Sequence, residues 1–203
     1  MTDGAQNRRV RVDGVRSRRM ILDTAVKLAT VDGLAGLSIA RLAEAAGISK
    51  SGLFAHFGSK EDLQLATIDA ATEIYGRDIV GPAMQEPDSS ARLRALCNLF
   101  LDQVENDVFP GGCFFSSVNS EFDTRPGIVR DRLAELQTQW MELLAAEYAA
   151  ARDAGLLPDE EPEQAAFDLN SYLHLANDLY VLYRDRSYLD RARRSIAAYL
   201  ATA

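Results

Sequence analysis

Cysteine and histidine are scarce in this chain of 203 residues, and the few that are present fit no familiar site. Cys97 and Cys113 are the only cysteines, and their spacing matches no metal-binding or CxxC pattern. His56 and His174 are the only histidines and lie far apart, without a recognisable ligand pattern. The sequence therefore predicts no catalytic constellation and no metal. It predicts two free thiols packed as small apolar groups, with a redox-sensing pair as the alternative.

Long hydrophobic runs are also lacking. No apolar stretch approaches the ~20 residues that a membrane-spanning helix requires. The first residues are polar and arginine-rich, without the hydrophobic stretch or cleavage site of a secretory signal. Alternating polar and apolar runs, which would indicate strands, do not occur. With 47% hydrophobic residues the chain can still bury a sizeable core, so we expect an all-α, cytoplasmic protein of one large or two small domains.

The most informative segment is LSIARLAEAAGISKSGLFAHFGSKEDL, residues 37–63. One face of its first helix is apolar, at the spacing of Ile39, Leu42, Ala43 and Ala46, with Ser38 placed to cap the helix and Gly47 to end it. In a second short helix the apolar stripe comprises Leu53, Phe54 and Phe57, and Lys50, Ser51, Ala55 and His56 lie outside it. This pattern predicts a helix-turn-helix whose second helix could enter a major groove, although such helix pairs also occur in other all-helical proteins.

A third helix is predicted to begin directly after this pair, with Ser59 as its cap. Glu61 and Asp62 suit the dipole at the start of that helix, whereas Lys60 does not. A lysine in this position is easier to explain if its ammonium and the helix amides face a phosphate.

Charge is divided unevenly along the chain. The whole sequence has 22 basic and 30 acidic side chains, which by itself argues against nucleic-acid binding. Residues 1–66, however, hold 10 basic and 7 acidic side chains, so the acidic excess belongs to residues 67–203. Six arginines at or before the start of the first long helix could neutralise phosphates: Arg8, Arg9, Arg11, Arg16, Arg18 and Arg19.

Gly33, the apolar run at 37–39, AEAAGIS, LFAHF and SKEDL together resemble the amino-terminal domain of the TetR/AcrR family of one-component transcriptional repressors. The resemblance extends from Ser17 through Leu63 with its spacing intact. Farther along, GGCFF and SEFDTRPG are more weakly similar to a turn found in some branches of that family. The resemblance implies an amino-terminal three-helix DNA-binding domain followed by a larger helical domain for effector binding and dimerisation, about nine helices in all.

We expect a mobile basic arm at 1–15, a helix-turn-helix domain at 16–66 and an effector-binding and dimerisation domain at 67–203. Outside the two short helices of the helix-turn-helix, glycine- and proline-containing turns separate the predicted helices. The first of these helices is expected at about 16–32, with Gly33 ending it. The others are expected at about 60–79, 91–106, 113–122, 128–154, 163–184 and 188–201.

The resemblance also implies which residues touch DNA. Positions that contact base edges are matched by Lys50, Ser51 and Gly52, and positions that hold the phosphate backbone by Ser38, Ser49, His56 and Lys60. His56 has an alternative role, because beside Phe57 it could simply cover the edge of the core. The family commonly has a tyrosine in place of Phe54, so a hydroxyl contact to phosphate is missing here. Gly52 and Ala55 also lack side chains that read bases, so we expect the arginine arm and DNA shape to compensate.

An effector pocket is implied in the second domain. Its candidate residues lie on the helices that enclose the ligand cavity of the resembled family: Phe100, Val104, Phe109, Phe114, Phe115, Asn119, Trp140, Leu144 and Tyr148. An apolar wall with a few polar groups would suit a small hydrophobic or aromatic molecule. The alternative is that these aromatic residues only form the core.

The helix expected at 163–184 is apolar over more of its circumference than one core-facing stripe requires. We therefore expect one face to meet another subunit, through Phe167, Tyr172, Leu175, Leu179 and Tyr183, unless the helix is buried between its own neighbours. In the resembled family the last two long helices form such an interface. A two-fold dimer would place its two reading helices, which are the second helices of the two helix-turn-helix motifs, ~34–36 Å apart. This spacing matches a palindromic operator.

Together these features predict a ligand-responsive repressor that binds operator DNA as a homodimer, needs no cofactor and is not an enzyme. An effector that tilts the helix expected at 60–79 would change the spacing of the two helices that enter the major groove, and it would thereby end DNA binding. A ligand-independent architectural DNA-binding protein is one alternative, which a cavity-free core would favour. An enzyme is the other, which a strongly shifted pKa in a cleft would favour.

Overall fold

A computed structural model describes residues 3–201 of the chain, and every element in that range is helical. The first part comprises α1 (Asp3–Asp32), α2 (Ile39–Ala45), α3 (Lys50–His56) and α4 (Lys60–Tyr75). From α4 the chain continues directly through a π-helical segment, η1 (Gly76–Val80), into α5 (Gly81–Ala83). The remaining helices are α6 (Ser89–Glu105), α7 (Phe114–Phe122), α8 (Ile128–Asp153), α9 (Pro162–Tyr183) and α10 (Ser187–Tyr199). Counting 60–83 as one helix, this range contains nine helices, which confirms the predicted all-α class.

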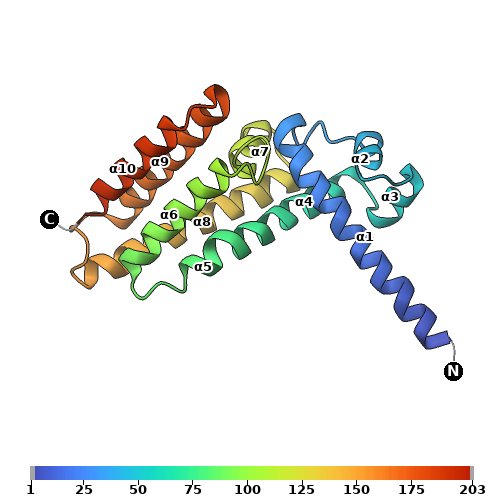
Figure 1. Cartoon of the computed structure of the whole chain (residues 1–203), viewed down its shortest axis with the longest axis horizontal. Helices are drawn as coiled ribbons and strands as arrows, with labels where there is room; N and C mark the ends of the chain where they lie inside the picture. Colours follow the sequence, from blue (N-terminus) through green and yellow to red (C-terminus); the bar gives the residue numbers. More distant parts are fainter. Residues whose placement is uncertain (1–2, 202–203) are drawn as a thin grey trace.

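The helices form two groups (Figure 1). The carboxy-terminal half of α1 packs with α2, α3 and the start of α4 at one end of the molecule, and α6 to α10 form the larger body. The run from α4 to α5 connects the two, since α4 contacts both α1 and α8. None of the helices within residues 3–201 combines the length and the apolarity needed to traverse a bilayer.

The first helix begins earlier than the sequence predicted. We expected it from Arg16, after an arm outside the fold, whereas α1 starts at Asp3 and its amino-terminal half projects away from the body (Figure 1). The buried stripe of Ile21, Ala25 and Ala29 stabilises the helix farther along the chain. Extending an existing helix is easier than starting one, because each added residue gains a backbone hydrogen bond, and arginine is a good helix former. The mobility of this segment stays a prediction.

The ends of the short helices follow the local chemistry that the sequence indicated. The Ser38 hydroxyl accepts a hydrogen bond from the amide of Arg41 at 3.2 Å, and the Ser59 hydroxyl accepts one from the amide of Asp62 at 3.0 Å. Gly33 after α1 and Gly47 after α2 have φ angles of 81° and 67°, which glycine adopts without a Cβ penalty. Both predicted caps and both predicted helix ends are confirmed.

Candidate nucleic-acid interface and effector cavity

The candidate DNA-reading surface is the outer side of α3. Leu53 and Phe57 are buried against the rest of the helix-turn-helix, whereas Lys50, Ser51 and Ala55 are exposed. The Ser49 hydroxyl caps α3 by accepting a hydrogen bond from the amide of Gly52 at 3.1 Å. One small exposed helix therefore presents a lysine, a serine and short side chains together.

Phe54 corrects one part of the sequence analysis. We placed it in the apolar stripe of the second helix with Leu53 and Phe57, but its side chain is 55% exposed. Leu53 and Phe57 are four residues apart and share a face, whereas one residue along a helix turns by about 100°. Phe54 therefore joins the exposed surface and forms the largest apolar group there.

Lys60 has a partner within the protein. Its ammonium donates a hydrogen bond to the carbonyl oxygen of Ala35, in the loop before α2, at 2.6 Å. This contact explains a lysine at the start of a helix without invoking a phosphate. The predicted phosphate contacts of Lys60, and those of the capping residues Ser38 and Ser49, stay predictions.

Aromatic and basic side chains meet at the end of α3. The half-buried His56 ring lies beside Phe57, with ring centroids 6.3 Å apart, and the Arg18 guanidinium lies 4.8 Å from the centroid of the Phe57 ring. Arg18 thereby joins α1 to the helix-turn-helix. Arg16 and Arg19 are exposed on the same helix, whereas the side chains of Arg8, Arg9 and Arg11 lie outside the described part of the structure.

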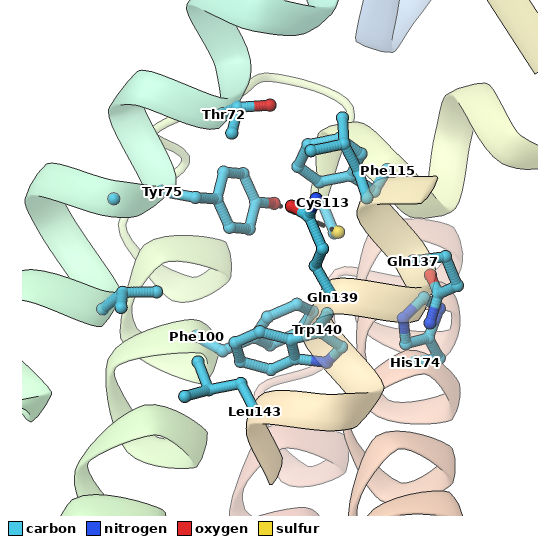
Figure 2. Close-up of a pocket in the computed structure, with 13 residues that line it drawn as sticks. Thr72, Tyr75, Phe100, Cys113, Phe115, Gln137, Gln139, Trp140, Leu143 and His174 are labelled. Atoms are coloured by element: carbon cyan, nitrogen blue, oxygen red, sulfur yellow. Dashed lines mark hydrogen bonds between the residues drawn. The ribbon is translucent and has the colours of Figure 1, made fainter. Parts of the chain in front are cut away.

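A cavity of about 250 Å³ lies in the body, beside the helix that follows the helix-turn-helix (Figure 2). Its wall draws on the run from α4 to η1 and on α6, α7, α8 and α9. The lining residues are Thr72, Tyr75, Gly76, Val80, Phe100, Cys113, Phe115, Leu136, Gln137, Gln139, Trp140, Leu143 and His174. This wall contains no lysine, arginine, aspartate or glutamate.

Three of the nine predicted pocket residues line this cavity: Phe100, Phe115 and Trp140. Five others are buried in the core instead: Val104, Phe109, Phe114, Leu144 and Tyr148. Asn119 does not line the cavity either, but its side-chain amide donates to the Oε1 atom of Gln137 at 3.3 Å. Helical spacing shows which residues share a face, and only the packing decides which face borders a void.

The sequence analysis missed the wall supplied by the connecting helix. Thr72 and Tyr75 lie three residues apart on one face of α4, immediately before the π-helical segment. The available signal was the glycine at position 76, which is unfavourable inside a long helical pattern. In the structure the π-helical segment begins at this glycine, and such segments often occur at functional sites.

Tyr75 and Cys113 form the main polar contact in the wall (Figure 2). The Tyr75 hydroxyl donates to the Cys113 sulfur at 3.1 Å, and the Cys113 amide donates to the Oδ1 atom of Asn177 at 2.7 Å. Burial, first, and then the neighbouring Cys113 raise the pKa of Tyr75 well above its ordinary value. Tyr75 therefore stays protonated and acts as a donor, which is the opposite of what a general base requires.

His174 approaches the cavity from α9. Its Nδ1 atom lies 3.0 Å from the Ser116 hydroxyl, and its ring stacks on Phe100 with centroids 6.1 Å apart. Burial lowers the pKa of His174, and the smaller effect of Asp178 opposes that shift. The imidazole is therefore neutral at pH 7.

Both cysteines are free and buried, as predicted. Burial raises the pKa of Cys97 to about 12, so its reactive thiolate form is negligible at neutral pH. Among residues 3–201 no group of three or more histidine, cysteine, aspartate or glutamate side chains is arranged to hold a metal ion.

Comparisons with known proteins agree with this architecture. Residues 21–67 match the sequence family described as "Bacterial regulatory proteins, tetR family", and residues 89–196 match "Tetracyclin repressor-like, C-terminal domain". No curated protein matches the sequence significantly.

Solved structures share the fold. A TetR transcriptional regulator from Chloroflexus aurantiacus is 24% identical with a TM-score of 0.85, over 93% of this chain and 96% of that one. A TetR-family regulator from Agrobacterium tumefaciens is 19% identical with a TM-score of 0.83, over 94% and 100%. AibR, solved in complex with isovaleryl coenzyme A and operator DNA, is 19% identical with a TM-score of 0.74, over 92% and 100%.

A helix-turn-helix joined to a helical body that contains a cavity defines a DNA-binding transcriptional regulator with a ligand-binding domain. The two matched regions lie on those two parts, and the carboxy-terminal match alone covers more than half of the chain. The chain belongs to the TetR family of transcriptional regulators.

Proposed function

We propose that this protein is a repressor that binds a palindromic operator as a homodimer and releases it when a small aromatic effector occupies the cavity. One observation carries the proposal: Thr72 and Tyr75 of the cavity wall belong to α4, the helix that begins directly after the helix-turn-helix. A ligand that favours another position of α4 would move the reading helix. The same cavity counts against a ligand-independent architectural role.

The wall favours an uncharged effector. Tyr75, Phe100, Phe115 and Trp140 offer aromatic contacts, and no ionic side chain lines the cavity to offset the cost of desolvating a charged ligand. Hydrogen-bonding groups come from Gln137, Gln139 and the neutral His174. A volume of about 250 Å³ lies below the ~300–1,000 Å³ of typical drug-sized sites, so the effector is small.

The structure of AibR supports the proposal that this protein responds to a ligand, because that structure contains isovaleryl coenzyme A and operator DNA in one complex. The phosphates of a coenzyme A molecule would require cationic partners. Since the cavity wall described above has none, we propose a different and uncharged effector here.

The dimer is proposed from the outer face of α9. Phe167, Leu175, Leu182 and Tyr183 have exposed fractions of 60%, 60%, 70% and 59%, an unusual concentration of large apolar side chains on one helix. Of the other predicted interface residues, Leu179 is half-buried, and Tyr172 packs on Tyr199 of α10, with ring centroids 6.2 Å apart. We therefore propose Leu182 as an additional interface residue and give Tyr172 a packing role within the subunit.

On the DNA side we retain the predicted contacts as part of this proposal. Lys50, Ser51 and Gly52 would face base edges, with Phe54 and His56 beside them. The division near residue 66 and a cytoplasmic location belong to the same proposal. Without base-reading side chains at 52 and 55, exposed Phe54 is suited to thymine methyl groups.

A gel-shift titration at fixed salt against DNA flanking the protein's own coding region tests the DNA function. We expect binding that favours one palindromic sequence over a scrambled duplex of equal length. Binding without any sequence preference would contradict the repressor proposal.

The effector class can be tested with the only tryptophan of the chain, Trp140, which lines the cavity. Three probes of similar shape and different charge are suitable: biphenyl-4-methanol, biphenyl-4-carboxylate and biphenyl-4-methylammonium. We expect the neutral alcohol to change Trp140 emission and weaken the gel shift at concentrations where the two ions do neither. Equal or tighter binding of either ion would overturn the uncharged class.

A further inference from the structure

The short loop between α1 and α2 is held by a carboxylate from the body of the molecule. The backbone amides of Leu34 and Ala35 donate hydrogen bonds to the two carboxylate oxygens of Glu121, at 3.0 Å and 2.8 Å. Glu121 lies near the carboxy-terminal end of α7, about 86 residues farther along the chain. A carboxylate that binds two adjacent amides fixes both the position and the orientation of that peptide.

The carbonyl groups of the same two residues are bound from the other side. The side-chain amide of Gln64 donates to the Leu34 carbonyl at 3.1 Å, and the Lys60 ammonium donates to the Ala35 carbonyl at 2.6 Å. Both donors belong to α4. The peptide turn at 34–35 is therefore gripped by α7 through its N–H groups and by α4 through its C=O groups.

Glycines allow this close approach. A Cβ atom on Gly33 would lie 2.7 Å from the Oε1 atom of Glu121, and the φ angle of Gly33 is +81°. Before α7, the Gly111 amide donates to the Thr30 hydroxyl at 3.1 Å, and a Cβ atom on Gly111 would collide with the Thr30 carbonyl. The segment from Gly111 to Glu121 thus touches the end of α1 at two places.

The other end of α7 lies at the cavity. Cys113 caps α7, Phe115 lines the cavity wall, and Ser116 pairs with His174. From Phe115 to Glu121 the helix rises by only roughly 9 Å. A displacement of Phe115 by a ligand would therefore reach Glu121 through fewer than two turns of one helix.

We infer that Glu121 is a positioning residue for DNA binding, which transmits the state of the cavity to the helix-turn-helix through the amides of Leu34 and Ala35. We call this four-bond arrangement with Glu121, Lys60 and Gln64 the Glu121 clasp. This route rests on the proposed function and adds to it a second connection, through α7, beside the direct one through α4. A ligand that shifts α7 loosens the clasp and releases the α1–α2 loop.

A double-mutant cycle on DNA affinity tests this role without a known effector. Phe115→Ala perturbs the cavity end of α7, and Glu121→Gln keeps the shape of the side chain while turning one acceptor oxygen into a donor group. We expect Glu121→Gln to weaken DNA binding roughly tenfold, as for a lost charge-assisted hydrogen bond. We expect Phe115→Ala to change the affinity several-fold with Glu121 present and less than about twofold in the Glu121→Gln background. Equal factors in both backgrounds, or no effect of Phe115→Ala beside Glu121, would overturn the inference.

Hydrogen exchange separates this result from a failure of the proposed function. In the free protein, Glu121→Gln should speed exchange of the Leu34 and Ala35 amides by about tenfold or more, while core amides of α8 exchange as before. Asp123→Asn is the matched control, because it removes the same charge from an exposed position just after α7. If the amides respond to both Phe115 and Glu121 but no DNA is bound, the clasp exists and the repressor proposal fails. If exchange at 34 and 35 is unchanged, the clasp is wrong whatever the DNA result.

Discussion

Two lysines of the amino-terminal domain occupy similar positions at helix starts and have different surroundings. Both residues are exposed. The Lys60 ammonium donates a hydrogen bond to the Ala35 carbonyl, and Lys50 is the first residue of α3. At a helix N-terminus a lysine lies against the dipole, so it needs a compensating negative partner. For Lys60 that partner is within the protein, and for Lys50 we propose that it is DNA.

Lys50→Ala should therefore weaken DNA binding by about tenfold or more and leave thermal stability nearly unchanged. Fluorescence anisotropy with a labelled operator duplex at fixed salt measures the effect. Arg194→Ala is the control, since it removes one positive charge from an exposed position on α10, in the body of the molecule. Equal losses for both variants would show that only net charge matters.

His174 gives the protein a pH-dependent stability. Because burial lowers its pKa below the ordinary 6.5, the unfolded chain takes up a proton there before the folded protein does. Its stabilising contribution is complete above about pH 6.5 and declines as the pH falls below that value. Urea unfolding between about pH 8 and pH 5 should show a steeper loss for the natural protein than for His174→Gln. Parallel curves for the two would refute this.

At the scale of the elements, the sequence specified what depends on neighbouring residues. Ser38 and Ser59 cap helices because their hydroxyls reach amides three residues ahead, and Gly33 and Gly47 end helices because their backbones must turn left-handed. These contacts need no partner from elsewhere in the chain. They were therefore predictable from short segments, as was the apolar spacing of most of the long helices.

Features that depend on distant segments were not predictable in the same way. The start of α1 at Asp3, the exposure of Phe54 and the cavity wall from Thr72 and Tyr75 all follow from how helices pack. The two hydrogen bonds that Glu121 accepts from the amides of Leu34 and Ala35 join residues separated by 87 and 86 positions in the sequence. No local sequence pattern predicts them. Glycine at 33 was noticed as a helix end, but its second reason, the carboxylate against it, required the structure.

Gly33 and Gly47, which both end helices, make a matched test of that second reason. A Cβ atom on Gly47 meets nothing within 4 Å, so Gly47→Ala should cost only the strain of its left-handed backbone, about 1 kcal/mol. Gly33→Ala carries the same strain and also displaces Glu121, which adds about 1–3 kcal/mol. Urea unfolding measures both. A smaller loss for Gly33→Ala than for Gly47→Ala would contradict the close approach.

At the scale of the whole molecule, α9 carries four of the eight large apolar side chains that are exposed in the described part of the chain. Two copies related by a two-fold axis would bury the outer face of α9 against itself and place both reading helices on one side of a duplex. The position of α9 in the body, away from α3, leaves the DNA surface free for this arrangement (Figure 1).

Leu175→Asp should convert the proposed dimer to monomers, because it places a charge within the proposed interface. Sedimentation velocity over a range of concentrations measures the change, and operator binding should weaken in parallel. Ile128→Asp is the control, since Ile128 is similarly exposed, at 54%, but lies at the start of α8. A natural protein that is monomeric at every concentration would exclude the dimer.

The cavity wall and the connection to the helix-turn-helix share α4, and any coupling of binding through this helix acts equally in both directions. If an effector in the cavity lowers the affinity of the protein for operator DNA by some factor, operator DNA must lower the affinity of the protein for the effector by the same factor. Adding operator DNA to the protein must therefore raise the effector concentration that fills half of the cavities, by up to the same factor.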